Sequence, residues 1–470
     1  MGKPTFIIIF CLTFLLLFLF LDIPFLLILS FGLNFTFLSI ITYYNISLEK
    51  KFSPFIGVFV VFNLLFFIVA PLIQIDTIVF KGIEGGSFIQ KFPFTQSSCI
   101  RANLYILLFN VIFFISYLRF SKNMIKFKWN YKVSYNNVPL ILAILGTLTF
   151  LIVILNFQTI LFQYQNEFYK EAEQTTVANY LLVQKFLFFI PLAGVVLSYF
   201  YLKFNTTKNW NYWIVLGLLV FFVVITFFLK NPLTEKRNTL GPIYITMIFL
   251  FFRNSLNSNF KIVRFMFIVM VLLFPLLTIF THSRNTLTQM LTRPNILVEN
   301  IKLLHVTDAF NSLHYDAYPN FLATIDFCDN KPVVYGEQLG PTFLFFVPRS
   351  IWHTKPEVTG FKIGNYLIER YNFDFNNLSN PYISEGYINF GLFGIILFAI
   401  ILAAIFVRLS NWLAGDDFLK TIFSFYFAIY LMYFLRGDLA NGFAFIIATY
   451  LAIVIFPKFL FVVINNYVKK

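Results

Sequence analysis

The amino-acid sequence predicts an all-α protein that crosses a membrane many times. Of its 470 residues, 59% are hydrophobic and 21% aromatic, and the mean hydropathy of +0.78 excludes an ordinary soluble domain. The apolar runs are about 18 to 25 residues long, which is the length that crosses a ~30 Å hydrocarbon core as an α-helix. These runs lack the strict alternation of an outer-membrane barrel, so a helical bundle is expected.

Twelve spans account for the apolar runs. The first run, from Thr5 to Leu21, is long for a secretory signal, lacks an Ala-x-Ala cleavage site and leads directly into a second run, so we expect a retained span. The spans are expected near 4–21, 24–44, 54–75, 99–120, 138–161, 181–202, 211–229, 238–252, 263–281, 385–407, 418–435 and 440–464. Residues 1–282 thus hold nine spans, residues 283–384 form one large polar, partly helical loop, and residues 385–470 hold the last three spans.

The distribution of charge predicts the orientation. If both termini lie in the cytoplasm, the inner segments carry 18 of the 35 Lys and Arg residues but only three of the 21 acidic residues. Almost all of the net charge of +14 is then cytoplasmic, as the positive-inside bias requires. The loop 283–384 is therefore expected outside the cytoplasm, together with all four histidines. The inner basic loops are explained by membrane insertion and contact with lipid, so no nucleic-acid partner is expected.

Several kinds of site are not supported by the sequence. Cys11, Cys99 and Cys328 have unrelated spacings, which fit neither a disulfide framework nor a thiolate metal site. The outer segments contain no HExxH, DxD or clustered-carboxylate string, and His305 and His314, nine positions apart, do not form the i, i+4 pair that places two imidazoles on one helix face. No G-x-S-x-G elbow or phosphate-binding glycine loop is present. We therefore expect a site without metal or cofactor.

Four arginines lie on the outer side near predicted helix ends or in the large loop. A single arginine at a membrane end often only extends its charge to the headgroups. Four of them on one face favour a further role, because the guanidinium is a rigid, permanently charged fork that suits a diphosphate. The four candidates for binding a diphosphate are Arg237, Arg284, Arg349 and Arg436.

A carboxylate opens the tenth span. Glu385 lies at the outer end of an apolar helix, where the helix dipole stabilises its charge, so it is either a helix cap or a general base for a sugar hydroxyl. His353 and His314 are the other candidates for the base. Gly386, Gly391 and Gly394 follow, and we interpret them as thinning one side of this helix for close packing.

Short motifs in the last third of the chain resemble a known family. They are VPRSIW at 347–352 with KP at 355–356, SEGY at 384–387, NFGLFG at 389–394 and RGD at 436–438. These motifs resemble the O-antigen and capsule polymerases of the Wzy type, and the expected span count and large late loop agree with that family. The spacing from Arg349 to Gly360 is also similar to an Arg-x10-Gly pattern of some members, although no second such pattern follows Arg237 or Arg284.

The resemblance implies a fold and an activity. The fold is that of the GT-C-like glycosyltransferases that use lipid-linked donors. The activity is metal-independent transfer of a growing glycan from undecaprenyl diphosphate to the non-reducing end of a new lipid-linked repeat unit, at the outer face of the bacterial inner membrane. The partners implied are the undecaprenyl-diphosphate-linked oligosaccharide and membrane lipid, with a chain-length regulator and a flippase as further candidates.

Three alternatives remain at this level. An O-antigen ligase uses the same donor but transfers the glycan to the lipid A core. A flippase or other transporter of the lipid-linked glycan is less favoured, because transporters place charged residues within their spans and these span interiors are nearly free of charge. A non-enzymatic scaffold would not need converging arginines.

Overall fold

The computed structural model describes residues 23–77, 91–122, 137–164, 181–232, 237–270 and 310–468, apart from Thr206, with Leu21 and scattered positions before it. Within these ranges the secondary structure is helical and contains no strand. Nine helical segments in them are long and apolar enough to cross a membrane. These segments are Phe25–Leu48, Pro54–Ile75, Gln96–Lys122, Val138–Leu155, Leu182–Phe204, Trp210–Leu229, Tyr382–Leu413, Phe418–Arg436 and Leu439–Tyr467.

The expected all-helical, polytopic membrane protein is confirmed, and nine of the twelve expected spans appear as helices of sufficient length. The expected span at 238–252 forms α12 (Arg237–Phe251), which has 15 residues and is shorter than the other spans. The expected span at 263–281 is described only as far as residue 270, where α13 (Asn259–Ile268) ends. Most of the expected first span lies outside the described residues.

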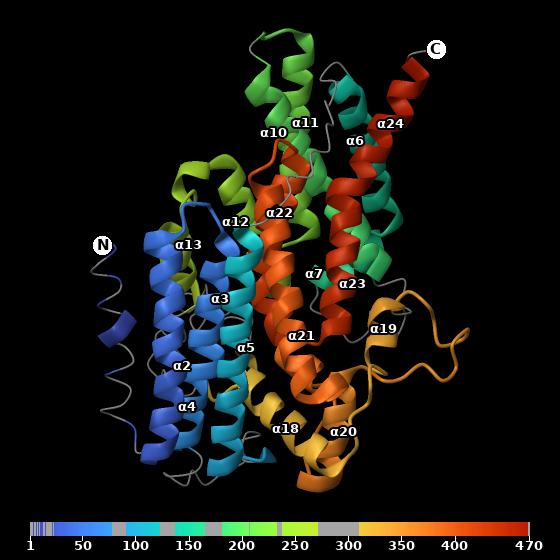
Figure 1. Cartoon of the computed structure of the whole chain (residues 1–470). Coiled ribbons are helices and arrows are strands. Elements are labelled where there is room, and N and C mark those ends of the chain that lie inside the picture. The colour runs from blue at the N-terminus through green and yellow to red at the C-terminus, as the bar shows by residue number, and fades with distance from the viewer. Residues whose placement is uncertain are drawn as a thin grey trace, which may run out of the picture.

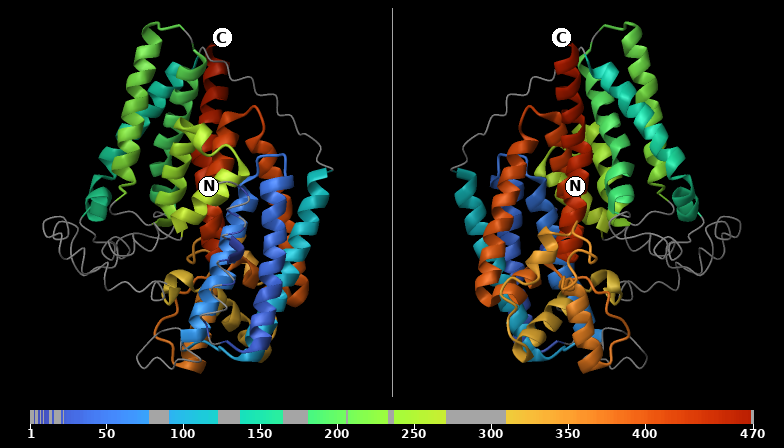
Figure 2. Two further views of the ribbon diagram at one scale, coloured as in Figure 1. Left: turned by 90° about the vertical axis from the view of Figure 1, so that its left-hand side faces the viewer. Right: turned by 90° about the vertical axis from the view of Figure 1, so that its right-hand side faces the viewer.

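The membrane-spanning helices form two groups (Figures 1 and 2). One contains α2 (Phe25–Tyr43), α3 (Pro54–Leu64), α4 (Ala70–Ile75) and α5 (Gln96–Lys122), and the other contains α6 (Val138–Leu155), α10 (Ile190–Phe204) and α11 (Trp210–Leu229). The C-terminal helices α21 (Tyr382–Leu413), α22 (Phe418–Arg436), α23 (Leu439–Tyr450) and α24 (Phe456–Val468) lie between the two groups. The short helix α7 (Phe157–Tyr164) follows α6.

The segment Pro54–Ile75 is the centre of the bundle, since it is buried along its whole length. Pro71 lies inside this continuous helix, where its ring would collide with the carbonyl of Phe67 in regular α-helical geometry. A π-helical turn at Leu65–Val69 directly precedes it, and such a turn is a common way to absorb an irregularity in a helix. The helix therefore continues past the proline and keeps its apolar side chains in the core.

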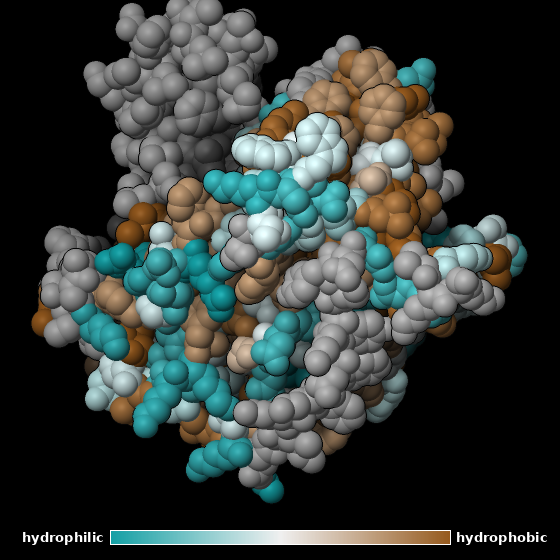
Figure 3. Space-filling view, turned by 90° about the horizontal axis from the view of Figure 1, so that it is seen from above, coloured by the Kyte–Doolittle hydropathy of each residue, from teal (hydrophilic) through white to brown (hydrophobic). Residues whose placement is uncertain are grey.

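Two ends of the bundle differ in character. The connections at 49–53, 207–209, 252–258 and 414–417 lie at the upper end in Figure 1. Seen from above, hydrophilic side chains gather across the middle of this face (Figure 3). These connections contain Lys50, Lys51, Lys208 and Arg253. At the lower end lie α18 (Ala317–Asn330) and α20 (Thr359–Tyr371), which both belong to the expected large loop 283–384.

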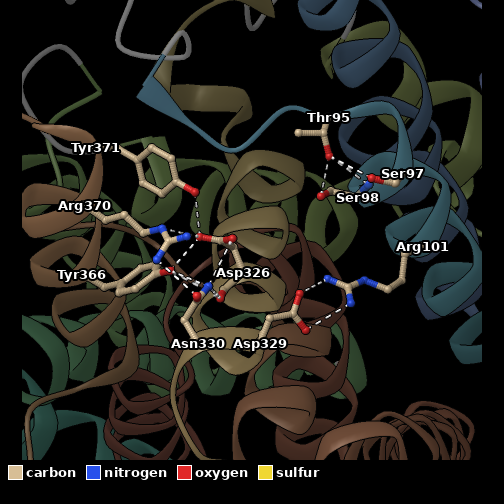
Figure 4. Close-up of polar contacts among 10 residues, drawn as sticks. All are labelled: Thr95, Ser97, Ser98, Arg101, Asp326, Asp329, Asn330, Tyr366, Arg370 and Tyr371. Atoms are coloured by element: carbon tan, nitrogen blue, oxygen red, sulfur yellow. Dashed lines mark hydrogen bonds and ion pairs between the residues drawn. The ribbon is translucent and has the colours of Figure 1, made fainter.

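A polar network joins α18 to α20 and fixes the lower end (Figure 4). The carboxylate of Asp326 accepts hydrogen bonds from the hydroxyls of Tyr366 at 2.7 Å and Tyr371 at 2.8 Å, and Arg370 lies 3.7 Å from the same oxygen. Both tyrosines have a raised pKa, mainly because of their burial and then because of the hydrogen bond to Asp326. All of these polar groups have partners within the network, so its role is structural.

The tenth expected span is kinked rather than straight. Phe390 and Gly391 leave the helical conformation, and Gly391 adopts φ 60° and ψ −142°, a region that is open to glycine only. A β-carbon on Gly394 would lie 1.8 Å from the carbonyl oxygen of Gly386, so the two arms of the kink meet backbone to backbone. These glycines permit a sharp bend within one span, where we had expected packing against a neighbouring helix.

Candidate functional site

A polar cavity of about 230 Å³ lies where α22 and α23 meet the segment before α21. Its walls come from three stretches of the chain, at 313–316, 375–379 and 433–441, that are distant from one another in sequence. The lining residues are Leu313, Asp316, Phe375, Asn377, Leu378, Ser379, Tyr433, Arg436, Asp438 and Asn441. Carboxylate, amide, hydroxyl and guanidinium groups thus converge on one space at the ends of membrane-spanning helices.

The tight connection between α22 and α23 positions two of these side chains. Arg436 is the last residue of α22, and Asp438 is the N-cap of α23, where its Oδ1 accepts a hydrogen bond from the backbone N–H of Ala440 at 3.0 Å. Aspartate is among the preferred residues at this position because it satisfies a free N–H of the first turn. The arginine and the aspartate are therefore held two residues apart on one rigid turn.

Arg436 is anchored by a buried carboxylate. Its Nε donates to Oδ1 of Asp316 at 3.0 Å, its Nη2 lies 2.9 Å from the same oxygen, and Nη2 also donates to the carbonyl of Leu313. Asp316 is further fixed by the hydroxyl of Ser379 at 2.8 Å. The third nitrogen, Nη1, has no hydrogen-bond partner among the described residues. The guanidinium thus has a fixed orientation and one free edge beside the cavity.

Asp438 is almost completely buried, with 5% of its surface exposed. Burial raises the pKa of its carboxyl, while backbone N–H groups of Gly360, Ala440 and Asn441 act in the opposite direction. The N–H of Gly360 donates to Oδ2 at 2.9 Å, so Asp438 also holds the first turn of α20. A buried carboxylate with a raised pKa at the wall of a cavity has the properties of a general base.

Glu385 lies behind this wall rather than in it. Its carboxylate accepts a hydrogen bond from the hydroxyl of Thr359 at 2.8 Å and a longer one, 3.3 Å, from the backbone N–H of Leu439. Only 1% of the residue is exposed, and it does not line the cavity. The side chain binds the first turn of α23, which is a capping contact to a different helix from its own.

The remaining sequence candidates are more dispersed. His314 lies in the 3-10 turn Leu313–Tyr315 and adjoins the cavity through Leu313, whereas His353 is exposed in the loop between α19 (Leu339–Phe343) and α20. Arg349 lies in that same loop and donates to the carbonyl of Lys355 at 2.7 Å. Arg237 is the first residue of α12. Arg284 lies outside the described residues. Of the four arginines, Arg436 lines the cavity, and the structure does not bring Arg349 to its walls.

Two cavity carboxylates, Asp316 and Asp438, were not among the sequence candidates. Asp438 was visible as part of the RGD motif, but its burial depends on the packing of α20. Asp316 pairs with an arginine 120 positions away in the sequence, and no local signal points to that contact.

Two buried lysines are exceptions to the expectation that the span interiors are nearly free of charge. Lys185, in the segment Leu182–Phe204, donates to Thr239 and lies over the ring of Phe445 at 4.4 Å. Lys230, at the end of α11, is fully buried and donates to Gln184 at 3.1 Å. Charged groups inside a membrane-spanning bundle are costly and commonly mark functional regions.

Among the described residues, no three His, Cys, Asp or Glu side chains are grouped so that they could hold a metal ion.

Comparison with known proteins identifies one family. The model of the family described as O-antigen polysaccharide polymerase Wzy matches residues 348–470. No curated protein and no solved structure shows a significant match to the chain. The matched region contains α20 to α24 and eight of the ten cavity-lining residues, from Phe375 to Asn441. The resemblance drawn from the short motifs is therefore confirmed over residues 348–470, which match the model of the Wzy-type O-antigen polysaccharide polymerases.

Proposed function

We propose that this chain polymerises lipid-linked oligosaccharide repeat units into O-antigen or capsular polysaccharide. The growing glycan is transferred from undecaprenyl diphosphate to the non-reducing end of a new repeat unit. The observation that carries the proposal is the overlap of two findings: the Wzy family match covers residues 348–470, and most of the polar cavity is built from that same stretch. The function thus rests on a site as well as on sequence similarity.

The cavity has the chemistry of a saccharide site, and we assign it to the acceptor sugar. Asn377, Ser379 and Asn441 offer amides and a hydroxyl, while Asp438 offers a carboxylate. These groups match the donors and acceptors of sugar hydroxyls. The cavity walls contain one arginine and two carboxylates. This balance of charge suits a neutral sugar better than a whole diphosphate.

In the mechanism we propose, Asp438 is the general base. Its carboxylate takes the proton from the acceptor hydroxyl as that oxygen attacks the anomeric carbon of the donor. The bond between that carbon and the diphosphate oxygen breaks, and its electron pair leaves with undecaprenyl diphosphate. Glu385 supports the turn that holds Asp438, through its contact with Leu439. His353 and His314 remain alternative bases, and the experiment on Asp438 below separates them from it.

The departing diphosphate requires positive charge. Arg436 offers the free Nη1 at the edge of the cavity, and Arg237, Arg284 and Arg349 remain candidates for the other contacts. Fixed donors aimed at a developing negative charge stabilise the transition state without a metal ion. An energy-rich glycosyl diphosphate supplies the driving force, so we propose a metal-independent reaction.

The proposed location follows from charge. The upper connections carry the cationic loops expected in the cytoplasm, so the cavity and the α18 and α20 segment face the outer side of the bacterial inner membrane, with both termini cytoplasmic. The lipid-linked oligosaccharide then reaches the cavity from the outer leaflet. A flippase that delivers the repeat unit and a chain-length regulator are the proposed protein partners.

Replacing Arg436 by alanine tests the site. We expect the purified variant, given lipid-linked repeat units, to lose chain extension by about 10²-fold or more, the typical cost of removing one donor to developing charge. The readout is the ladder of products resolved by length. Arg408→Ala is the matched control, because Arg408 is exposed on α21 toward the opposite end of the bundle, over Trp412. Equal ladders from both variants would remove Arg436 from the reaction.

A deletion strain separates the polymerase from the ligase. Loss of a polymerase leaves single repeat units attached to the lipid A core, whereas loss of a ligase leaves none.

A further inference from the structure

The loop between α19 and α20, residues 344–356, is held in shape by its own two cations. Nζ of Lys355 donates to three backbone carbonyls, those of Leu344 and Phe345 at 3.2 Å each and that of Val347 at 2.9 Å. Arg349 closes the loop from the other side, with Nη1 donating to the carbonyl of Lys355 at 2.7 Å. Carbonyl contacts of this kind fix the backbone without any surrounding core.

The outside of this braced loop is strongly apolar. Ile351 is 74% exposed, Phe346 62%, Phe343 54% and Leu344 44%. Single exposed apolar residues are ordinary, but these four lie within nine positions, with Phe343 at the end of α19 and the other three on the loop, and form a patch of the kind that contacts a partner. Trp352 lies beside them with its ring 6.0 Å from Nζ of Lys355.

The loop lies against a membrane-spanning helix close to the end of that helix. The ring of Phe443 on α23 meets the rings of Phe343 and Phe345 at centroid distances of 5.3 Å and 6.3 Å. Phe443 follows the first residue of the span, Leu439, by four positions, which places it roughly 6 Å inside the span. The apolar patch therefore lies against a candidate membrane span, Leu439–Tyr467, that also exposes the apolar side chains of Leu451, Ile455 and Phe459.

The charge of the loop is positive and is not neutralised nearby. Neither Arg349 nor Lys355 forms an ion pair within the described ranges. The pKa of Lys355 is lowered, first by burial and then by the positive charge of Arg349. The closest acid in sequence, Glu357, accepts a hydrogen bond from Asn365 at 2.9 Å instead.

We propose that residues 343–352 insert their apolar tip into the outer leaflet of the membrane beside α23, with Arg349 and Lys355 at the depth of the phosphate headgroups. Aromatic and aliphatic side chains flanked by arginine and lysine are the composition that binds a membrane–water interface. The partner is a lipid surface containing anionic headgroups. The loop then anchors the start of α20, and with it Gly360 and Asp438, at a fixed depth.

Site-specific fluorescence in vesicles tests the proposal on the full chain. Cys11 and Cys328 are replaced by alanine, since the third native cysteine, Cys99, is buried, and a single cysteine is introduced as Ile351→Cys or Phe346→Cys and labelled with the environment-sensitive dye NBD. The matched control is Glu369→Cys on the exposed face of α20. We expect the dye at 346 and 351 to emit at shorter wavelength than at 369 and to be quenched by spin-labelled lipid rather than by aqueous iodide.

Two results would overturn the proposal. If iodide quenches the dye at 351 and spin-labelled lipid does not, the tip lies in water. If neither quencher reaches it, a protein partner or a second copy of the chain covers the loop. Vesicles of phosphatidylcholine alone, compared with vesicles that also contain phosphatidylglycerol, test the cations: quenching by spin-labelled lipid should be stronger with the anionic lipid, and equal quenching would exclude headgroup binding by Arg349 and Lys355.

Discussion

The variant Asp438→Asn is expected to lose chain extension by about 10² to 10⁴-fold, the usual contribution of a general base. Asparagine keeps one oxygen for the N–H of Ala440, but its amide nitrogen cannot accept from Gly360. The unpaired N–H costs about 1–3 kcal/mol, so the melting temperature should fall modestly while the helical bundle persists. Product ladders and thermal unfolding in detergent, measured on the same preparation, separate the two effects.

The comparison variant is Glu385→Gln. Glutamine still offers an oxygen to the N–H of Leu439 and an amide to the hydroxyl of Thr359, so the capping contact is retained. We expect a smaller loss of activity than in Asp438→Asn. A larger loss in Glu385→Gln than in Asp438→Asn would transfer the role of base to Glu385, and normal ladders from Asp438→Asn would leave the histidines as candidates.

The same aspartate predicts a dependence on pH. Its pKa is raised by burial, so the rate should increase as the pH rises through that value and the carboxylate becomes available as a base. The free energy of unfolding should change in the opposite direction. A carboxyl whose pKa is raised in the folded state contributes stability below its unfolded pKa, and that contribution is lost as the pH rises through the folded pKa. Asp438→Asn should flatten both profiles, and an unchanged rate profile would contradict the assignment.

The variant Gly360→Ala is expected to abolish chain extension through packing. A β-carbon at this position would lie 2.0 Å from the backbone carbonyl oxygen of Leu378, which no side-chain movement relieves. Helix α20 must then shift away from the segment before α21, the wall formed by Leu378 is displaced, and the hydrogen bond to Asp438 breaks. Overpacking commonly costs about 1–3 kcal/mol, and a backbone collision belongs at the upper end or above.

Gly217→Ala is the matched control, because a β-carbon on Gly217 in α11 meets no atom within 4 Å. Alanine is about 1 kcal/mol better than glycine inside a helix, so this variant should melt at the same or a higher temperature and make normal ladders. If Gly360→Ala had the same melting temperature and the same product ladders as Gly217→Ala, the close approach of α20 to Leu378 would be contradicted.

The sequence predicts the membrane architecture well, because a span is a local property. Twenty apolar residues in a row form a helix in lipid whatever they pack against, and this holds for segments such as Trp210–Leu229. This local argument does not predict the kink in α21. Three glycines in one apolar run fit a smooth helix as well as a bent one, and the close approach of Gly386 to Gly394 decides between them.

The candidate site was predictable in kind but less so in its members. Residue type led to Arg436 and to the RGD turn, since a permanent charge at a helix end suggests an anion. Arg349 is also an arginine, yet its guanidinium donates to carbonyls of its own loop and does not line the cavity. The pairing of Arg436 with Asp316, and the displacement of Glu385 from the cavity wall, depend on contacts between distant segments that no local pattern encodes.

All residues that line the cavity fall between Leu313 and Asn441, whereas the helices that support them from behind, α2 to α5, come from the first quarter of the chain. The proposed sugar site and its scaffold are thus encoded on separate stretches of the gene. A recombination event that exchanges the 313–441 stretch between two such proteins should carry the preference for a particular glycan with it, and exchange of the early helices should leave that preference in place.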